Sequence, residues 1–136
     1  MKSFFEWTNE LTVNIEEIDS QHKEFIHLIN ELYISIKTGK SSEVPGNILS
    51  RVVEYATIHF ATEERLMKIH GYPELANHKK EHQELKENLL ELNRRFNDGQ
   101  SVSAGSVAVF LKDWLTNHIR MTDMKYGSFL KIKGMI

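Results

Sequence analysis

The residues of this sequence that could do chemistry are histidines and carboxylates at helical spacing. His59 and Glu63 stand four residues apart, as do His78 and His82. Residues four apart share one helix face, with their Cβ atoms about 5 to 6 Å apart, so each pair could reach one metal ion or two adjacent ions. The sequence contains no cysteine, and any metal must therefore take nitrogen and oxygen ligands. The full candidate set comprises His22, His59, Glu63, His78, His82, His118 and Asp123.

This set supplies five imidazoles and two carboxylates. That number is too large for one tetrahedral ion, and it suits two octahedral metals bridged by the carboxylates. The segment 78–82 also fits a His-x-x-Glu-His zinc-protease signature, but that motif accounts for only two of the five histidines. We assign neither of the two remaining histidines to metal. We expect His27 to be solvated and His70 to meet the last carbonyls of its helix.

Four stretches with the period of an amphipathic helix must position these side chains. We expect helices over about 19–38, 45–70, 73–97 and 103–121, followed by a short tail over 122–136. Their ends are marked by capping and stop residues: Asp19, Pro45 and Ser103 at the starts, and Gly39, Gly71 and Asp98-Gly99 at the ends. The pattern predicts an all-α protein, a single domain over 1–136. Its architecture would be an up-down-up-down antiparallel four-helix bundle with a short N-terminal lead-in and C-terminal tail.

The candidate donors occupy positions that apolar neighbours mark as facing the bundle axis. In the third helix His78 and His82 continue the stripe of Leu85, and in the fourth His118 stands in the same stripe as Met121. Unsatisfied polar groups in a core cost about 1 to 3 kcal/mol each. Some common partner must therefore satisfy these side chains, and a metal centre would do so.

The spacing of His118 and Asp123 needs a local departure from the α-helix. The two residues are five apart, which places them about 140° out of phase on a regular helix. We therefore predict a widened turn, a π-bulge, around 119–122, which would bring Asp123 back to the core. The apolar part of the tail, from Tyr126 onwards, is expected to pack against the bundle.

Charge and composition argue against several classes of partner. There are 17 Lys and Arg against 19 Asp and Glu, a formal net charge of −2. The chain thus lacks the basic excess that nucleic-acid binding or charge-driven membrane binding requires. Glu6 interrupts the apolar N-terminus, and no later apolar run reaches transmembrane length. We expect a soluble cytoplasmic protein that binds neither nucleic acid nor membrane.

The ordered set of donors resembles the hemerythrins, and among them the single-domain bacterial type. The resemblance covers nearly the whole chain and rests on Trp7, 18–22, 59–64, 78–82, 114–119 and Asp123. It implies a non-haem centre of two iron ions, with a bridging oxo or hydroxo group, that binds dioxygen reversibly. One iron would take three histidines and the other two, with both carboxylates bridging: the residues that match are His78, His82 and His118, then His22 and His59, and finally Glu63 and Asp123. The two-histidine iron would keep one position open for dioxygen.

Apolar residues beside the donors are the expected wall of the oxygen pocket: Phe25, Phe60, Trp114, Leu115 and Ile119. A dry wall with few proton donors would slow the loss of bound oxygen as peroxide or superoxide. The resemblance thus implies a protein of oxygen storage, delivery or buffering rather than an enzyme. A di-iron enzyme or scavenger acting on peroxide or nitric oxide, a sensor and an iron store are alternatives that would use the same site. The sequence does not identify a protein partner.

Overall fold

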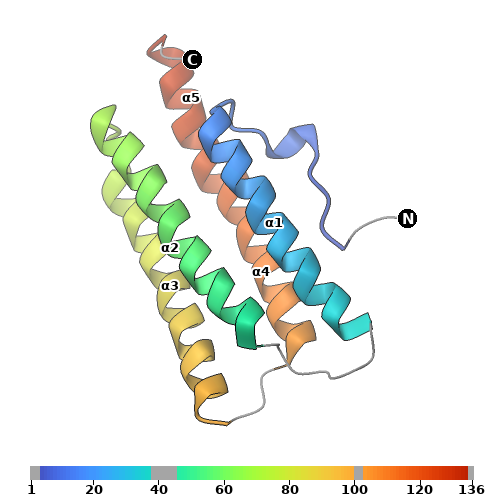
Figure 1. Ribbon diagram of the computed structural model, residues 1–136. Helices are drawn as coiled ribbons and strands as arrows, with labels where there is room; N and C mark the ends of the chain where they lie inside the picture. The colour runs from blue at the N-terminus through green and yellow to red at the C-terminus, as the bar shows by residue number, and fades with distance from the viewer. Residues whose placement is uncertain (1–3, 38–45, 100–102, 135–136) are drawn as a thin grey trace.

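The computed structural model describes residues 4–37, 46–99 and 103–134, and helices make up most of them (Figure 1). The four long helices are α1 (Glu16–Lys37), α2 (Gly46–Ile69), α3 (Leu75–Asn97) and α4 (Ala104–His118). A short 3-10 turn, η1 (Asn9–Leu11), precedes them. A π-helical segment, η2 (Ile119–Asp123), leads from α4 into α5 (Met124–Ile132). The prediction of an all-α four-helix bundle is confirmed.

The long helices run alternately up and down, and α4, η2 and α5 together form one continuous rod (Figure 1). α1 packs against α2 and α4, and α2 packs against α3. The apolar side chains that face the axis are buried, among them Leu32, Leu49, Leu89 and Leu111. Their removal from water is the main favourable contribution to folding.

The start of α1 differs from the expectation. The helix begins at Glu16, so Asp19 lies in its first turn rather than at its N-cap. The Asp19 carboxylate accepts hydrogen bonds from the backbone N–H of Val13, at 2.9 Å, and from the hydroxyl of Thr12. Asp19 therefore holds the N-terminal lead-in against the bundle. The glutamates that precede it favour the earlier start, because acidic residues in a first turn complement the helix dipole.

Most of the other helix ends agree with the sequence. The Oγ of Ser103 accepts from the backbone N–H of Ser106, as an N-cap does. Gly71 and Gly99 follow α2 and α3 with φ of 67° and 80°, values that favour glycine. α3 begins at Leu75, two residues later than expected, because Pro73 and Glu74 form a turn. The expected stop at Gly39 and start at Pro45 lie outside the described residues.

The C-terminal tail continues the fourth rod as α5. Tyr126 and Leu130 are buried, which confirms that this part packs against the bundle, but Ile132 is 83% exposed. Met121, expected in the core stripe, is 64% exposed, because the π-helical turn changes the phase of the residues that follow His118. At Gly127 the rod approaches the lead-in so closely that a Cβ atom would lie 2.6 Å from the carbonyl oxygen of Val13.

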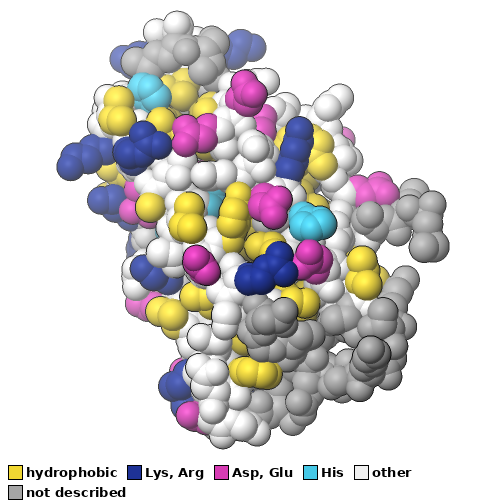
Figure 2. All heavy atoms as spheres, in the orientation of Figure 1, with side chains coloured by type: hydrophobic (Ala, Val, Ile, Leu, Met, Phe, Trp, Pro, Cys, Tyr) yellow, Lys and Arg dark blue, Asp and Glu magenta, His cyan; other side chains and the backbone are white. Residues whose placement is uncertain are grey.

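One face of the molecule shows how the charged side chains are distributed. Lysine and arginine side chains alternate with aspartate and glutamate over the face shown in Figure 2. This agrees with the nearly balanced charge of the sequence, −2. Within the described ranges, no helix has the length and apolar character needed to cross a bilayer.

Candidate metal centre

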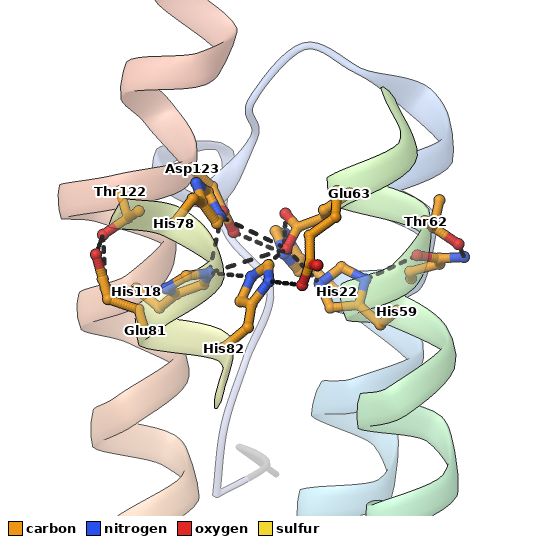
Figure 3. Close-up of polar contacts among 12 residues, drawn as sticks. His22, His59, Thr62, Glu63, His78, Glu81, His82, His118, Thr122 and Asp123 are labelled. Atoms are coloured by element: carbon orange, nitrogen blue, oxygen red, sulfur yellow. Dashed lines mark hydrogen bonds and ion pairs between the residues drawn. The ribbon is translucent and has the colours of Figure 1, made fainter. Parts of the chain in front are cut away.

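The seven candidate donors point toward one another in the core (Figure 3), nearer the end of the bundle at which α1 and α3 begin. Alternation of helix direction brings together the first turns of α1 and α3 with the last turns of α2 and α4. None of the seven is more than 3% exposed. They are His22 from α1, His59 and Glu63 from α2, His78 and His82 from α3, His118 from α4, and Asp123 from η2.

Asp123 lies among three imidazoles from three different helices. Its Oδ2 is 3.0 Å from the Nε2 of His22. Its Oδ1 is 2.7 Å from the Nε2 of His78 and 3.1 Å from the Nε2 of His118. An imidazole nitrogen therefore lies within 3.1 Å of each of its oxygens.

Glu63 stands in a similar position. Its Oε1 is 3.3 Å from the Nε2 of His59 and 3.0 Å from the Nε2 of His82. Its Oε2 is 3.8 Å from the Nε2 of His22. All five imidazoles thus turn their Nε2 atoms inward, toward the two carboxylates (Figure 3).

The donors form two overlapping groups that share both carboxylates, and in each group one ligand atom per residue lies within 4.8 Å of the others. The larger group holds three histidines and the smaller group two: His78, His82 and His118, and then His22 and His59, each with Glu63 and Asp123. Two ligands bound about 2.1 Å from one ion at right angles lie about 3 Å apart, and the shortest nitrogen–oxygen distances above are of that size. The cluster is therefore able to bind a metal centre.

The widened turn that the sequence predicts is present. Ile119–Asp123 is a π-helical segment, and Ile119 and Asp123 are both buried in it. A π turn contains more residues than an α turn, so a residue five positions after His118 returns to the same face of the rod. This local geometry, and not a loop, places the Asp123 carboxylate in the core.

The centre carries buried polar atoms that protein contacts do not satisfy. Among the described residues, nine buried side-chain atoms make no hydrogen bond of acceptable geometry, although several lie at ion-pair distance from one another. They include both oxygens of Glu63 and of Asp123 and the Nε2 atoms of His22, His59 and His78. Such groups are rare in proteins and costly. A pair of cations would supply the missing partner to the seven atoms that face the centre, which excludes only the Nδ1 atoms of His22 and His78.

The electrostatics keep both carboxylates ionised. Burial opposes ionisation of Glu63, but the imidazoles that face it, that of His59 foremost, hold the pKa of Glu63 well below its usual range. The pKa of Asp123 is lowered in the same way, against its burial and the charge of Glu63, chiefly by His118. Burial lowers the pKa of His59 to about 4, so this imidazole stays neutral with a lone pair free for a metal.

His78 behaves differently from His59. Burial favours its neutral form, but the carboxylates of Asp123 and Glu63, 2.7 and 3.8 Å from its Nε2, outweigh burial and raise the pKa of His78 to about 9. The pKa of His118 is also raised, against its burial, chiefly by Asp123. Without a metal, protons on these imidazoles therefore balance the carboxylates, and an incoming cation would displace them.

A second set of polar residues lies behind the imidazoles, and sequence reasoning missed it. The Nδ1–H of His59 donates to Gln21 Oε1 at 2.7 Å, and the Nδ1–H of His82 donates to Glu64 Oε2 at 2.9 Å. The Nδ1–H of His118 lies 3.3 Å from Glu81 Oε1. A hydrogen bond at Nδ1 selects the tautomer whose Nε2 lone pair faces the centre.

A positional signal for this second set exists in the sequence. Gln21, Glu64 and Glu81 each stand directly beside a candidate donor in the chain. They therefore lie at the edge of the buried face, within reach of the next helix. Glu81 is also the glutamate of the protease-like signature, and it accepts hydrogen bonds from the hydroxyl of Thr122 in addition to His118 (Figure 3).

The residues expected to form the pocket wall surround the centre. Phe25, Phe60, Leu115 and Ile119 are buried, and Trp114 is partly buried. Phe60 stacks on His82 with ring centroids 4.1 Å apart, and Trp114 stacks on His118 at 4.5 Å. Phe25 lies edge-on to His59 at 6.5 Å. Trp114 thus covers the three-histidine group and Phe25 faces the two-histidine group, while Phe60, whose ring also lies 5.8 Å from that of His59, contacts both.

The two remaining histidines stand apart from the donor groups. His27 is 62% exposed and pairs with Glu31 at 3.1 Å, which agrees with the expectation that it is solvated. His70 was expected to meet helix carbonyls, but its Nδ1 shares a 2.6 Å hydrogen bond with the hydroxyl of Tyr126. The tyrosine comes from α5, which lies beside the end of α2, and its hydroxyl takes the place that the carbonyls were expected to have.

Comparisons with known proteins agree with this arrangement. A family model described as "Hemerythrin HHE cation binding domain" matches residues 13–130. The bacteriohemerythrin of Stenotrophomonas maltophilia is 35% identical over 125 residues, covering 92% of this chain and 80% of that protein. The bacteriohemerythrin of Methylococcus capsulatus is also 35% identical, covering 91% of this chain and 95% of that protein.

A solved structure gives the same result for the fold. The crystal structure of wild-type hemerythrin superposes with a TM-score of 0.85 at 34% identity, covering 93% of this chain and 97% of that chain. Fold, donor cluster and sequence similarity therefore agree over nearly the whole length. This chain belongs to the hemerythrin family.

Proposed function

We propose that this protein binds dioxygen reversibly at two iron ions held in the bundle core. The observation that carries the proposal is the buried cluster of five inward-facing imidazoles around two shared carboxylates. Membership of the hemerythrin family supports iron as the metal. The donor set also fits iron, since imidazole and carboxylate are its ordinary ligands in non-haem proteins.

The proposed ligands follow the two donor groups. His78, His82 and His118 would hold one iron, and His22 and His59 the other. Glu63 and Asp123 would bridge the two ions together with a solvent-derived oxo or hydroxo group. The centre would supply a reversible binding site for dioxygen, with the open position at the ion that has fewer histidines.

The protein would contribute a dry, proton-poor surrounding. Phe25, Leu115 and Ile119 are buried beside the donors and have no exchangeable proton on their side chains. Excluding water and proton donors slows the loss of bound oxygen as a reduced species. The cysteine-free sequence is compatible with a reducing compartment, and a cytoplasmic location is part of the proposal.

The decisive experiment is an oxygen cycle on the iron-loaded protein. Iron analysis should give two ions per chain. Oxygen added to the anaerobic, reduced protein should produce charge-transfer bands in the near ultraviolet and visible, and these bands should disappear under vacuum and return with oxygen. Glu63→Gln is the control, because it removes one shared carboxylate and should bind fewer than two irons. Irreversible bleaching with consumption of peroxide would contradict the proposal and indicate a di-iron enzyme.

The pocket wall has its own test. Leu115→Ser places a hydroxyl in the apolar surrounding, and we expect an unchanged iron content with faster autoxidation. Ile58→Ser, at a side chain that is 51% exposed, is the matched control and should leave the rate unchanged. A folded, iron-loaded Leu115→Ser variant that autoxidises at the rate of the original protein would remove Leu115 from the wall.

A further inference from the structure

The two donor groups differ in what lies behind their imidazoles. In the three-histidine group, Glu64 accepts from His82 at 2.9 Å and Glu81 lies 3.3 Å from the Nδ1 of His118. The hydroxyl of Thr122, 2.9 and 3.0 Å from the two oxygens of Glu81, fixes that carboxylate in place. This group therefore has two anionic carboxylates behind its imidazoles.

The two-histidine group has a neutral residue in the equivalent place. Gln21 accepts from His59 at 2.7 Å through its amide oxygen, and its amide nitrogen donates to the hydroxyl of Thr62 at 3.2 Å. The Thr62 bond fixes which end of the amide faces the imidazole. The Nδ1 atoms of His22 and His78 have no hydrogen-bond partner among the described residues. Behind the imidazoles, the three-histidine group thus has two carboxylates, whereas the two-histidine group has one neutral amide.

We propose that this difference in charge sets the order in which the two metal positions release their ions, an inference that rests on the proposed function. Glu64 and Glu81 make the three-histidine position the slower to release its metal, and Gln21 keeps the two-histidine position the faster. All three are positioning residues, since they act through an imidazole and do not touch the metal.

The physical basis is the effect of a hydrogen-bond acceptor on the far nitrogen of the ring. A carboxylate that accepts from Nδ1–H makes Nε2 a stronger base and adds negative charge near the cation. A neutral amide orients the ring but adds no charge. Losing such a partner typically weakens metal binding by about 10- to 100-fold. The larger number of histidines at one metal position favours the same order of metal release. Only an exchange of the charged and neutral residues behind the imidazoles therefore separates the effect of charge from that of ligand number.

Glu64 and Glu81 are partly exposed, which makes it practical to exchange their charge with the neutral side chain of Gln21 by mutation. The side chains of Glu64 and Glu81 are 27% and 43% exposed, so glutamine at either position removes a charge without opening a cavity. Glu84→Gln is the matched control, because Glu84 is exposed on the same helix, one turn beyond Glu81. Gln21→Glu adds the missing charge behind His59.

The experiment measures iron release from the reduced, iron-loaded full chain to an excess of a coloured ferrous chelator. The original protein should release its two irons in two phases. Glu64→Gln and Glu81→Gln should each accelerate the slow phase by about tenfold or more, while Glu84→Gln changes neither phase. Gln21→Glu should slow the fast phase by a similar factor and narrow the gap between the phases.

A spectroscopic readout separates this role from a merely structural one. In the zinc-loaded, ¹⁵N-labelled protein, Glu64→Gln should shift the Nδ1 resonance of His82 and leave that of His59 in place, and Gln21→Glu should do the reverse. Circular dichroism checks the helix content of each variant. If one glutamine variant fails to fold, the other carboxylate and Gln21→Glu still decide the matter.

The outcomes distinguish this inference from the function on which it rests. Variants that keep two irons and reversible oxygen binding, yet release iron in unchanged phases, overturn the inference alone. Acceleration of the fast phase by Glu64→Gln also overturns it. An original protein that never holds two irons overturns both this inference and the proposed function.

Discussion

The two ends of the bundle bury side chains of opposite character on the same helical faces. At the end that lies away from the donors, the axis is filled by Leu32, Leu49, Leu89 and Leu111, all at most 1% exposed. At the donor end the same stripes bury imidazoles and carboxylates to a similar extent. The apolar end is stabilised by leaving water, whereas the donor end has nine buried polar atoms without a proper partner among the described residues.

The difference teaches that helix periodicity can bury polar and apolar residues alike, and side-chain chemistry decides what burial costs. The apolar end needs no ligand to be stable. The donor end is stable only to the extent that something compensates its charges, which protons on His78 and His118 do when no metal is bound. The comparison therefore predicts that the two ends respond differently to metal removal and to mutation.

Metal removal should give the largest effect, and it should be confined to one end. A ligand at a thousand times its Kd adds about 4 kcal/mol to the free energy of unfolding, so a chelator should lower that free energy by about this amount for each ion. Hydrogen exchange should show lost protection around 59–63 and 118–123 and retained protection around 85–92. A uniform loss of protection along the helices would break the comparison.

A cavity at the apolar end should give the converse result. Leu89→Ala removes a side chain that is 1% exposed, and such substitutions cost about 2 to 5 kcal/mol. We expect a lower free energy of unfolding in denaturant titrations, with two irons per chain still bound. Leu90→Ala, at a neighbouring side chain that is 46% exposed, should stay within about 0.5 kcal/mol of the original protein. Loss of iron from Leu89→Ala would show that the ends are not independent.

Tyr126 should give the smallest effect, and a pH-dependent one. Burial, and then the charge of Glu63, raise the pKa of Tyr126 to about 12, against about 10 in the unfolded chain. The unfolded chain ionises first as pH rises, so this phenol contributes stability below pH 10 that is lost as pH rises through 12, about 3 kcal/mol in total. Tyr126→Phe has no phenol to ionise, so its free energy of unfolding should not show this loss between pH 10 and pH 12. Stability curves of the two proteins that stay parallel between pH 9 and pH 12 would contradict this.

The fold and the donors could be predicted because both depend on local periodicity. Steps of three and four residues define a buried stripe without knowledge of any other helix, and they placed His78 and His82 on the core side of α3. The five-residue step from His118 to Asp123 was also informative, because only a widened turn makes it compatible with two buried side chains, and that turn is present.

The features that could not be predicted are contacts between distant segments. The hydrogen bond of His70 to Tyr126 joins residues 56 apart in sequence, and that of Glu81 to His118 joins residues 37 apart. Asp19 was expected to cap its own helix, but the lead-in folds back and offers the Val13 N–H instead. In each case a polar side chain forms a hydrogen bond with a partner from a distant segment, and only the packed bundle brings that partner within reach.

The π-helical segment also indicates how the donor end could be re-engineered. Removing one amino acid from 119–122, with the solvent-facing Met121 as the natural choice, would leave the histidine and the aspartate four positions apart. On a regular helix that offset amounts to about 40°, so both side chains would still point inward and the downstream register would be kept. Deletion of a single residue should thus give an uninterrupted helix that carries its share of the same seven donors. A shortened version of this kind would reveal what the bulge itself contributes.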